Sequence, residues 1–368
     1  MSKHNTVNTG RQLEIDLLKA FSIITMIICH VFDIMTTTGE GDDLLKHIIY
    51  FFGNLSSGLF IICMGIGIVY TTHDSPPAFA KRGIKLLLQG YLLNFFKNFL
   101  PLLFLTGFNP LEIDQEDRFS TFSTEILTLA GLVFLLTALL KKLKCKPWIY
   151  CAVALTFQVI ATVFNGAFDN SPIAVRYILG LFFYTGSPIV SGYPLFVFYI
   201  YVCFGMLFGK SLQYTENKRK FYLKWAVCGA AVFVVSSVIY KLVKFNLSDY
   251  YLTETYHANI LPAAIWFIGL SVIWAAVSYP ASLIINAKTR NAVMFLSRNI
   301  TNIYVIHWFC IIFVMLTLYV IAGGPLPPIA GLPLSAAICL ITIALSKLWN
   351  TVKTKIKKKE PGNVATSE

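Results

Sequence analysis

The sequence carries little charge. Only 13% of its 368 residues are Asp, Glu, Lys or Arg, about half the share of ordinary soluble globular chains. Hydrophobic residues make up 56%, and the mean hydropathy is +0.67. A chain of this length would suffice for two soluble domains, but this composition excludes them. The sequence therefore predicts an all-α, polytopic membrane helical bundle in the cell inner (cytoplasmic) membrane, with the lipid bilayer as a partner.

Other features are also absent. No short apolar core with a small-residue cleavage site follows the N-terminus, so we expect the first apolar segment to remain as a membrane helix. None of the eight cysteines has metal-site spacing or lies in an acidic loop suited to a disulfide, so we expect packing roles for them and no metal. No internal repeat is visible, which weakens the case for a transporter built from two similar halves.

Apolar windows of about 20 residues mark the expected membrane helices. We count ten, at residues 15–36, 49–72, 84–106, 122–141, 147–165, 193–210, 221–243, 259–284, 301–322 and 331–348. The apolar run 173–185 is too short to cross, so we expect a re-entrant or interfacial segment there. We expect three parts: a cytoplasmic segment at 1–12, one transmembrane domain at 13–348, and a basic, lipid-contacting cytoplasmic tail at 349–368.

Basic and acidic residues alternate from loop to loop. The basic loops and segments are 81–85, 141–146, 210–224, 288–298 and the C-terminal tail. The acidic loops are 39–43, 112–117 and 249–254. The positive-inside rule places the basic set, and with it both termini, in the cytoplasm. The same distribution accounts for the net charge of +12, so we expect no nucleic-acid partner.

The first predicted span contains ionisable residues at a depth where they are costly. Lys19 and His30 are eleven residues apart, which returns to nearly the same side of an α-helix, and Asp16 and Asp33 each lie three residues from one of them. A single membrane-buried His often only bridges two helices. Four ionisable groups on one stripe instead predict a wet or protein-facing cavity along this helix.

Several segments resemble the motifs of a known family. The start of the first span resembles the basic-x10-His signature of transmembrane acyltransferases. It contains Arg11, then Glu-Ile-Asp16 and Lys19, and ten residues separate Lys19 from His30. The glycine-punctuated segment 58–67, the basic segment 81–85 and the Tyr-x-x-His segment 299–308 are similar to later elements of that group. The sequence resembles bacterial proteins grouped with the heparan-α-glucosaminide N-acetyltransferase catalytic domain, and more broadly acyltransferase family three. The stretch 127–140 departs from the pattern because it lacks the expected polar residues.

The resemblance implies transfer of an acetyl or short acyl group from cytoplasmic acetyl-CoA (acyl-CoA), the co-substrate, to a hydroxyl or amine of an envelope saccharide acceptor. We expect His30 to be the general base, because imidazole titrates near neutrality. Asp33 is either the carboxylate that orients this ring or a helix-end charge in solvent. We expect Asp16 and Lys19 to form a buried pair at the cytoplasmic mouth.

The other candidates fall into a donor group and an acceptor group. The donor group suits the phosphates of CoA by charge or position and comprises Arg11, Arg82, Lys85, Arg298 and Tyr304. We expect His307 to lie one or two turns below His30 and either to contact the CoA arm or to cap Tyr304. The acceptor group comprises His47 in an outer loop, Asn94 and Lys97; Lys97 is equally suited to snorkel to the membrane interface.

Two further interpretations stay open. A transporter, or a flippase for a lipid-linked saccharide, would use Lys19 and His30 for proton coupling. A catalytically inactive relative would serve as a membrane scaffold.

Overall fold

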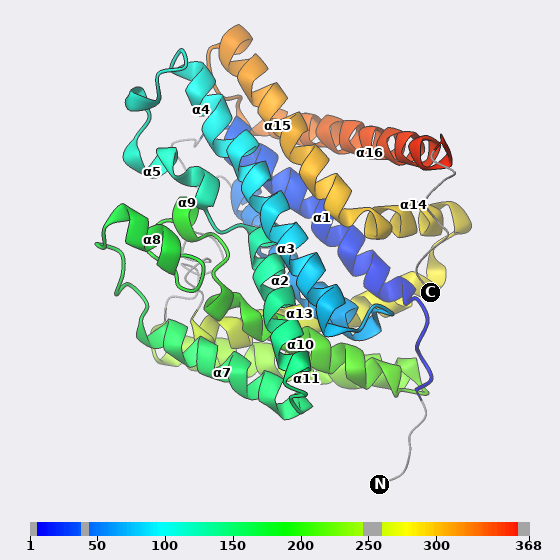
Figure 1. Ribbon diagram of the computed structural model, residues 1–368. Coiled ribbons are helices and arrows are strands. Elements are labelled where there is room, and N and C mark those ends of the chain that lie inside the picture. The colour runs from blue at the N-terminus through cyan, green and yellow to red at the C-terminus, as the bar shows by residue number, and fades with distance from the viewer. Residues whose placement is uncertain (1–5, 38–43, 246–259, 360–368) are drawn as a thin grey trace.

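The computed structural model describes residues 6–37, 44–245 and 260–359, which form a bundle of helices (Figure 1). Within these ranges there is no β-strand, only two isolated bridges. The all-α class is therefore confirmed. Seven of the described helices are long and apolar enough to cross a membrane: α1 (Leu13–Met35), α2 (Leu44–Tyr70), α10 (Leu195–Gln213), α11 (Lys218–Leu242), α13 (Leu261–Ile284), α15 (Ile300–Ala322) and α16 (Pro328–Lys359).

The three other predicted spans also coincide with helices. α3 (Pro76–Asn94) continues through the π-helix η1 (Phe95–Phe99) into α4 (Leu100–Leu105). α6 (Ile126–Lys142) and α7 (Pro147–Val163) have 17 residues each. Seven apolar helices indicate a multi-pass membrane protein, whereas the count of ten crossings and the cytoplasmic position of both termini remain predictions.

Short elements cover one end of the bundle. They are the 3-10 turns η2 (Pro110–Glu112) and η3 (Ser120–Phe122) and the helices α5 (Gln115–Arg118), α8 (Ile173–Leu179) and α9 (Pro188–Ser191). With seven residues, α8 is too short to cross, so the segment 173–185 is not a further span. Of the predicted acidic loops, 39–43 and 249–254 lie outside the described residues.

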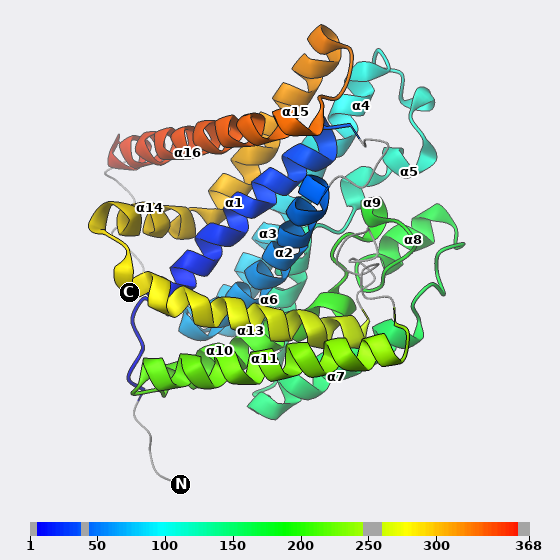
Figure 2. The same cartoon turned by 180° about the vertical axis from the view of Figure 1, so that it is seen from behind.

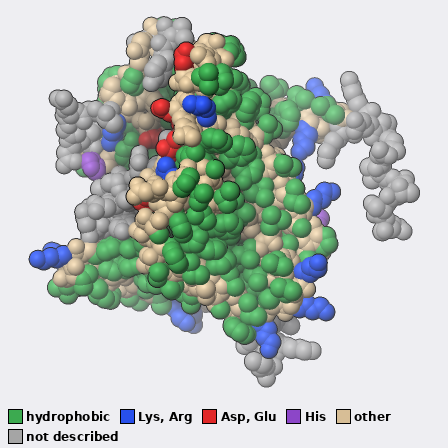
Figure 3. Space-filling view, turned by 60° about the vertical axis from the view of Figure 1, so that its left-hand side comes forward, with side chains coloured by type: hydrophobic (Ala, Val, Ile, Leu, Met, Phe, Trp, Pro, Cys, Tyr) green, Lys and Arg blue, Asp and Glu red, His purple; other side chains and the backbone are tan. Residues whose placement is uncertain are grey.

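Two helical segments differ from the predicted layout. α14 (Ala287–Arg298) is a short helix that follows α13 and packs against α1, although the sequence interpretation placed a loop there. α16 continues to Lys359, so the first half of the expected tail is an extension of the last helix. Figure 3 shows a face covered mainly by hydrophobic side chains, with Lys and Arg along its lower and right-hand edges.

α1 runs through the middle of the bundle (Figure 2) and contacts α2, α13, α14, α15 and α16. Because lipid is as apolar as a side chain, close packing rather than the hydrophobic effect holds such helices together. α2 and α10 show this most clearly: a Cβ atom on Gly65 would lie 2.1 Å from the Val202 carbonyl oxygen, and one on Gly205 would lie 2.1 Å from that of Ile62. The backbones of these two helices are therefore in direct contact.

Candidate active site

Two buried carboxylates anchor the first turn of α1. Asp16 accepts hydrogen bonds from Arg11 Nη2 at 3.0 Å and from Ser297 Oγ of α14 at 2.6 Å. Glu14 accepts one from Lys218 Nζ of α11 at 2.7 Å. The predicted Asp16–Lys19 pair is wrong, because Arg11 and Ser297 already satisfy Asp16.

Lys19 lies where two cavities meet. The first has a volume of about 320 Å³ and is lined by Arg11, Asp16 and Arg298 among others. The second, of about 120 Å³, extends toward Arg82, Leu127 and Thr301. Lys19 and Gly67 line both cavities. Within the described ranges Lys19 has no hydrogen bond or ion pair, so its ammonium group is available to an anionic ligand.

Two histidines face each other further along α1. The rings of His30 and His307 are nearly parallel, with centroids 5.7 Å apart, and the Trp308 ring is 4.5 Å from His30. His307 therefore lies at the level of His30, and the expectation that it lies one or two turns below is wrong. The cause is that α15 begins beside the middle of α1 and not beside its first turn (Figure 1), so helix depth does not follow from counting residues.

His307 is completely buried, and its two ring nitrogens differ. Nδ1 is 3.3 Å from the carbonyl oxygen of Ile303. Because a carbonyl only accepts, Nδ1 carries the proton in the neutral ring and Nε2 presents a lone pair. Among the described residues Nε2 has no hydrogen-bond partner.

A buried glutamate, which the sequence interpretation missed, lies beside the histidines. Glu125 forms the N-cap of α6: Oε1 accepts from the Leu127 backbone at 3.1 Å, and Oε2 accepts from the hydroxyl of Tyr304. Tyr304 is thus bonded to Glu125 rather than capped by His307. Glu125 also interacts electrostatically with Lys97.

Lys97 points inward. Its Nζ atom is 4.2 Å from the centroid of the Trp308 ring, a cation–π geometry. The residue belongs to the π-helix η1, an irregularity that often occurs at functional sites. The snorkelling interpretation of Lys97 is therefore wrong, because its ammonium group is directed inward to four other polar side chains. Together with Lys97 they form what we call the polar cluster: Lys97, Glu125, Tyr304, His307 and His30.

α3 makes room for Glu125 and holds the chain that precedes it. A Cβ atom on Gly90 would lie 2.8 Å from Thr128 Oγ1 and 3.2 Å from Glu125 Oε1, so only glycine fits this position without displacement. One turn later, the amide of Asn94 donates to the Ser123 carbonyl at 2.8 Å. Asn94, a candidate for acceptor binding, therefore positions the start of α6.

Neither cavity is lined by His30 or His307. The inner cavity includes Leu127 and Thr301, which lie close in sequence to Glu125 and Tyr304. Three residues of helix correspond to about 4.5 Å, so His307 is about one turn beyond Tyr304. The hydrogen bond between Tyr304 and Glu125 thus stands between the cavities and the histidine pair.

Three other candidates lie apart from these cavities. Asp33 is exposed near the end of α1, and Lys85 is exposed on α3 and lines neither cavity. His47 is half-buried in the first turn of α2, so its predicted place in a loop is wrong. In the part of the chain that the structure describes, no group of three or more His, Cys, Asp or Glu side chains is arranged to hold a metal ion.

A family model described as "Heparan-alpha-glucosaminide N-acetyltransferase, catalytic" matches residues 11–238, more than half of the chain. The chain belongs to this family. The resemblance drawn from the motifs is thereby confirmed, and it points to a membrane acetyltransferase. No curated protein is similar enough to the chain to count as a match.

The matched region of this acetyltransferase contains Lys19, His30, Lys97 and Glu125, whereas α15, with Tyr304 and His307, lies beyond it. One signal in the sequence marks Glu125. It is the only charged residue between Arg118 and Lys141, and it immediately precedes an apolar helix.

Proposed function

We propose that this acetyltransferase moves an acetyl or short acyl group from cytoplasmic acyl-CoA to a hydroxyl or amine of an envelope sugar or glycan, in the cell inner membrane. The observation that carries the proposal is the Lys19 ammonium, which has no hydrogen bond or ion pair with any described residue. It joins two cavities that lead from Arg11 and Arg298 to within about one helical turn of the buried polar cluster.

The donor side is defined by positive charge. Lys19, Arg82 and Arg298 line the cavities, and guanidinium and ammonium groups form charge-assisted hydrogen bonds with phosphates. Arg11 is already bonded to Asp16, so we assign it to shaping the mouth together with Asp16. Lys85 lines neither cavity, so any contact it makes with CoA lies outside them.

The pantetheine arm would then run past Lys19 toward Tyr304. Because the Tyr304–Glu125 hydrogen bond lies across this path, the thioester reaches the histidines only when that bond is displaced. We assign Tyr304 to the donor path for this reason.

In the reaction, His30 accepts the proton of the acceptor O–H or N–H while the oxygen or nitrogen attacks the thioester carbonyl carbon. The C–S bond breaks, CoA leaves as a thiolate, and the proton on His30 passes to the sulfur to give free CoA. The lone pair on His307 Nε2 can accept a hydrogen bond from the acceptor and so orient it. Asp33 stays a predicted orienting carboxylate for His30.

The acceptor is expected at the opposite end from the basic mouth. Lys97 is the candidate to contact acceptor hydroxyls, since it lies beside Trp308 and the histidines. Asn94 donates to the carbonyl of Ser123, two residues before Glu125, so we assign it to positioning Glu125. His47 remains a predicted acceptor contact.

Binding of the donor tests the proposal. We expect acetyl-CoA to raise the melting temperature of the detergent-solubilised protein, and the rise to disappear in Arg298→Ala and Arg82→Ala. Lys142→Gln, an exposed lysine that lines neither cavity, should keep it. Proton-driven uptake of a saccharide with no effect of acetyl-CoA would contradict the proposal and favour the transporter.

A further inference from the structure

A third, much larger cavity shares only Thr301 with the two cavities of the proposed donor path. It is a groove of about 940 Å³ between α15 and α16, with Gln89 of α3 at its edge. Its walls are apolar and include Phe313 and Trp349, which are 73% and 53% exposed. In Figures 1 and 2 the two helices diverge from each other. The predicted topology makes this groove open to the hydrocarbon of the bilayer.

Polar groups occur at only one end of the groove. They are Gln89, Thr301 and Asn302, and the last two belong to the first turn of α15, on the predicted cytoplasmic side. An apolar trough with one polar end has the profile of a single phospholipid: hydrocarbon chains along the helices and a headgroup at the membrane surface.

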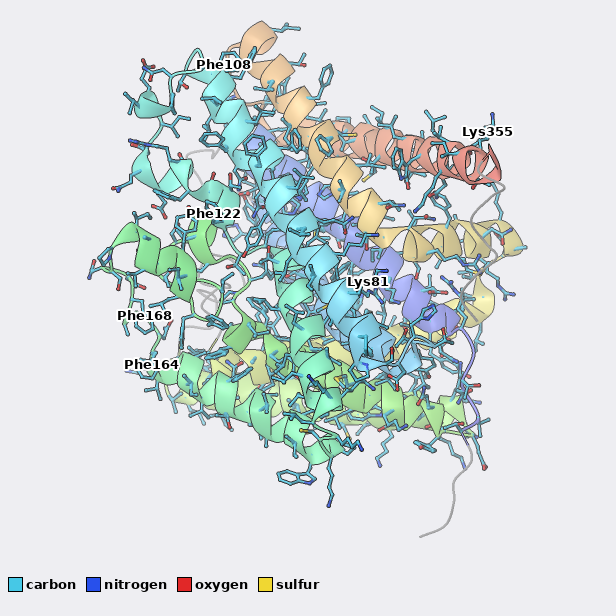
Figure 4. All side chains as sticks on the ribbon, viewed as in Figure 1. Lys81, Phe108, Phe122, Phe164, Phe168 and Lys355 are labelled. Carbon is cyan, nitrogen blue, oxygen red and sulfur yellow. The ribbon has the colours of Figure 1, made fainter. Side chains whose placement is uncertain are left out.

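The charge at that end has one sign. Lys85 lies one turn before Gln89 on the same face of α3, and Lys355 lies three residues after Val352, a groove residue of α16. Both lysines are exposed, and neither has an ion pair within the described ranges. Figure 4 labels Lys355 near the free end of α16, away from the end of the bundle where Phe108 and Phe122 lie.

Within the described ranges, the helices that carry this rim contain no acidic residue. The sequence contains no Asp or Glu between Asp74 and Glu112, nor between Glu254 and Glu360, and these two stretches include the whole of α3, α14, α15 and α16. A zwitterionic headgroup would gain little here, whereas an anionic one is attracted by each nearby lysine.

We propose that the groove between α15 and α16 binds an anionic glycerophospholipid of the inner leaflet, with its headgroup beside Gln89, Asn302, Lys85 and Lys355. A second copy of this chain is a poorer occupant. A twofold interface would place this patch of one copy against the same patch of the other copy. The lysines of the two copies would then face each other, and their like charges would repel. The inference does not depend on the acyl-transfer proposal, because no residue of the donor path except Thr301 lines the groove.

Native mass spectrometry of the full chain in neutral detergent tests this site. Dioleoyl phosphatidylglycerol and dioleoyl phosphatidylcholine have the same chains, so they differ only in the headgroup. We expect the first to bind at least about tenfold more tightly, since two lysines near the headgroup each contribute about fivefold. The double variant Lys85→Gln/Lys355→Gln should lose about 25-fold of the phosphatidylglycerol affinity.

The matched control is Lys142→Gln/Lys224→Gln, which removes two exposed cytoplasmic-side lysines from other helices and should bind like the parent. Leu345→Trp, which fills the groove wall, should remove binding of both lipids. Equal affinity for the two lipids, or equal losses in the two double variants, would overturn the proposal. So would a dimer cross-linked through Phe313→Cys at the groove.

Discussion

At the scale of single residues, the charges buried around Trp308 form one interacting set. Among the described residues, Glu125 is the carboxylate that interacts electrostatically with Lys97, and it also accepts a hydrogen bond from Tyr304. Removing one member of a buried charge pair leaves the other without compensation, which typically destabilises a protein by about 3 kcal/mol or more.

We therefore expect Glu125→Gln to lower the melting temperature clearly, although the glutamine still fills the site and can accept from Tyr304. Tyr304→Phe removes a single hydrogen bond and should cost about 1 to 2 kcal/mol. If the charges are coupled, the double variant Lys97→Met/Glu125→Gln will be more stable than the sum of the two single losses implies. Simple additivity of the two losses would contradict the coupling.

Lys19 offers a second test at this scale. Lys19→Met keeps the length of the side chain but removes a charged donor, and hydrogen bonds to charged groups contribute about 1.5 to 3 kcal/mol. We expect acetyl-CoA to bind about tenfold or more weakly by isothermal titration, and Lys19→Arg to retain most of the affinity. An unchanged dissociation constant in Lys19→Met would show that the cavity junction does not hold the donor.

The sequence predicted part of this residue pattern. The eleven-residue spacing of Lys19 and His30 placed both on one stripe, and both do face α15: Lys19 shares a cavity with Ile300 and Thr301, and His30 packs on Trp308. The partner of Asp16 could not be predicted, because Ser297 is 281 residues away and α14 was not expected. Glu125 was missed because its burial results from tertiary contacts: Thr124 beside it pairs through its backbone with Val190 and Tyr193, and Tyr304 of α15 bonds to its carboxylate.

At the scale of elements, contact between α2 and α10 depends on two glycines. A methyl group at Gly65 would meet the backbone of Val202, which has no flexible side chain to move away. We expect Gly65→Ala to destabilise the protein by about 3 kcal/mol or more.

Gly67→Ala on the same helix is the control for stability. A Cβ atom there meets nothing within 4 Å, so the change should be neutral or should stabilise the helix by up to about 1 kcal/mol. Melting temperatures in detergent distinguish the two variants. Similar melting temperatures would mean that α2 and α10 do not approach as closely as described.

Hydropathy predicted the helices better than their ends. Every predicted span coincides with a helix, because about 20 apolar residues in lipid have few alternatives. α14 was missed because it is short and basic, and its helical state depends on packing against α1. α16 extends beyond its apolar part because nothing in the lysine-rich sequence before Lys359 stops a helix.

At the scale of the whole molecule, the orientation in the membrane still rests on charge alternation. It predicts that the acidic segment that contains Gln115 lies on the outer side of the membrane and that Lys142 lies on the cytoplasmic side. In a cysteine-free background, an impermeant maleimide added to intact cells should label Gln115→Cys but label Lys142→Cys only after the cells are broken. The opposite pattern would invert the assignment of donor and acceptor sides.

The donor path and the histidine pair lead to one central hypothesis: the acyl donor enters from the basic mouth and reacts beside His30 and His307. The most direct measurement is incorporation of labelled acetyl from acetyl-CoA into the saccharide fraction of membranes that contain the protein. His30→Gln should bind acetyl-CoA with the affinity of the parent but reduce the transfer rate at least about 100-fold, since general base catalysis contributes that much or more. Transfer by His30→Gln at the parent rate would contradict the account.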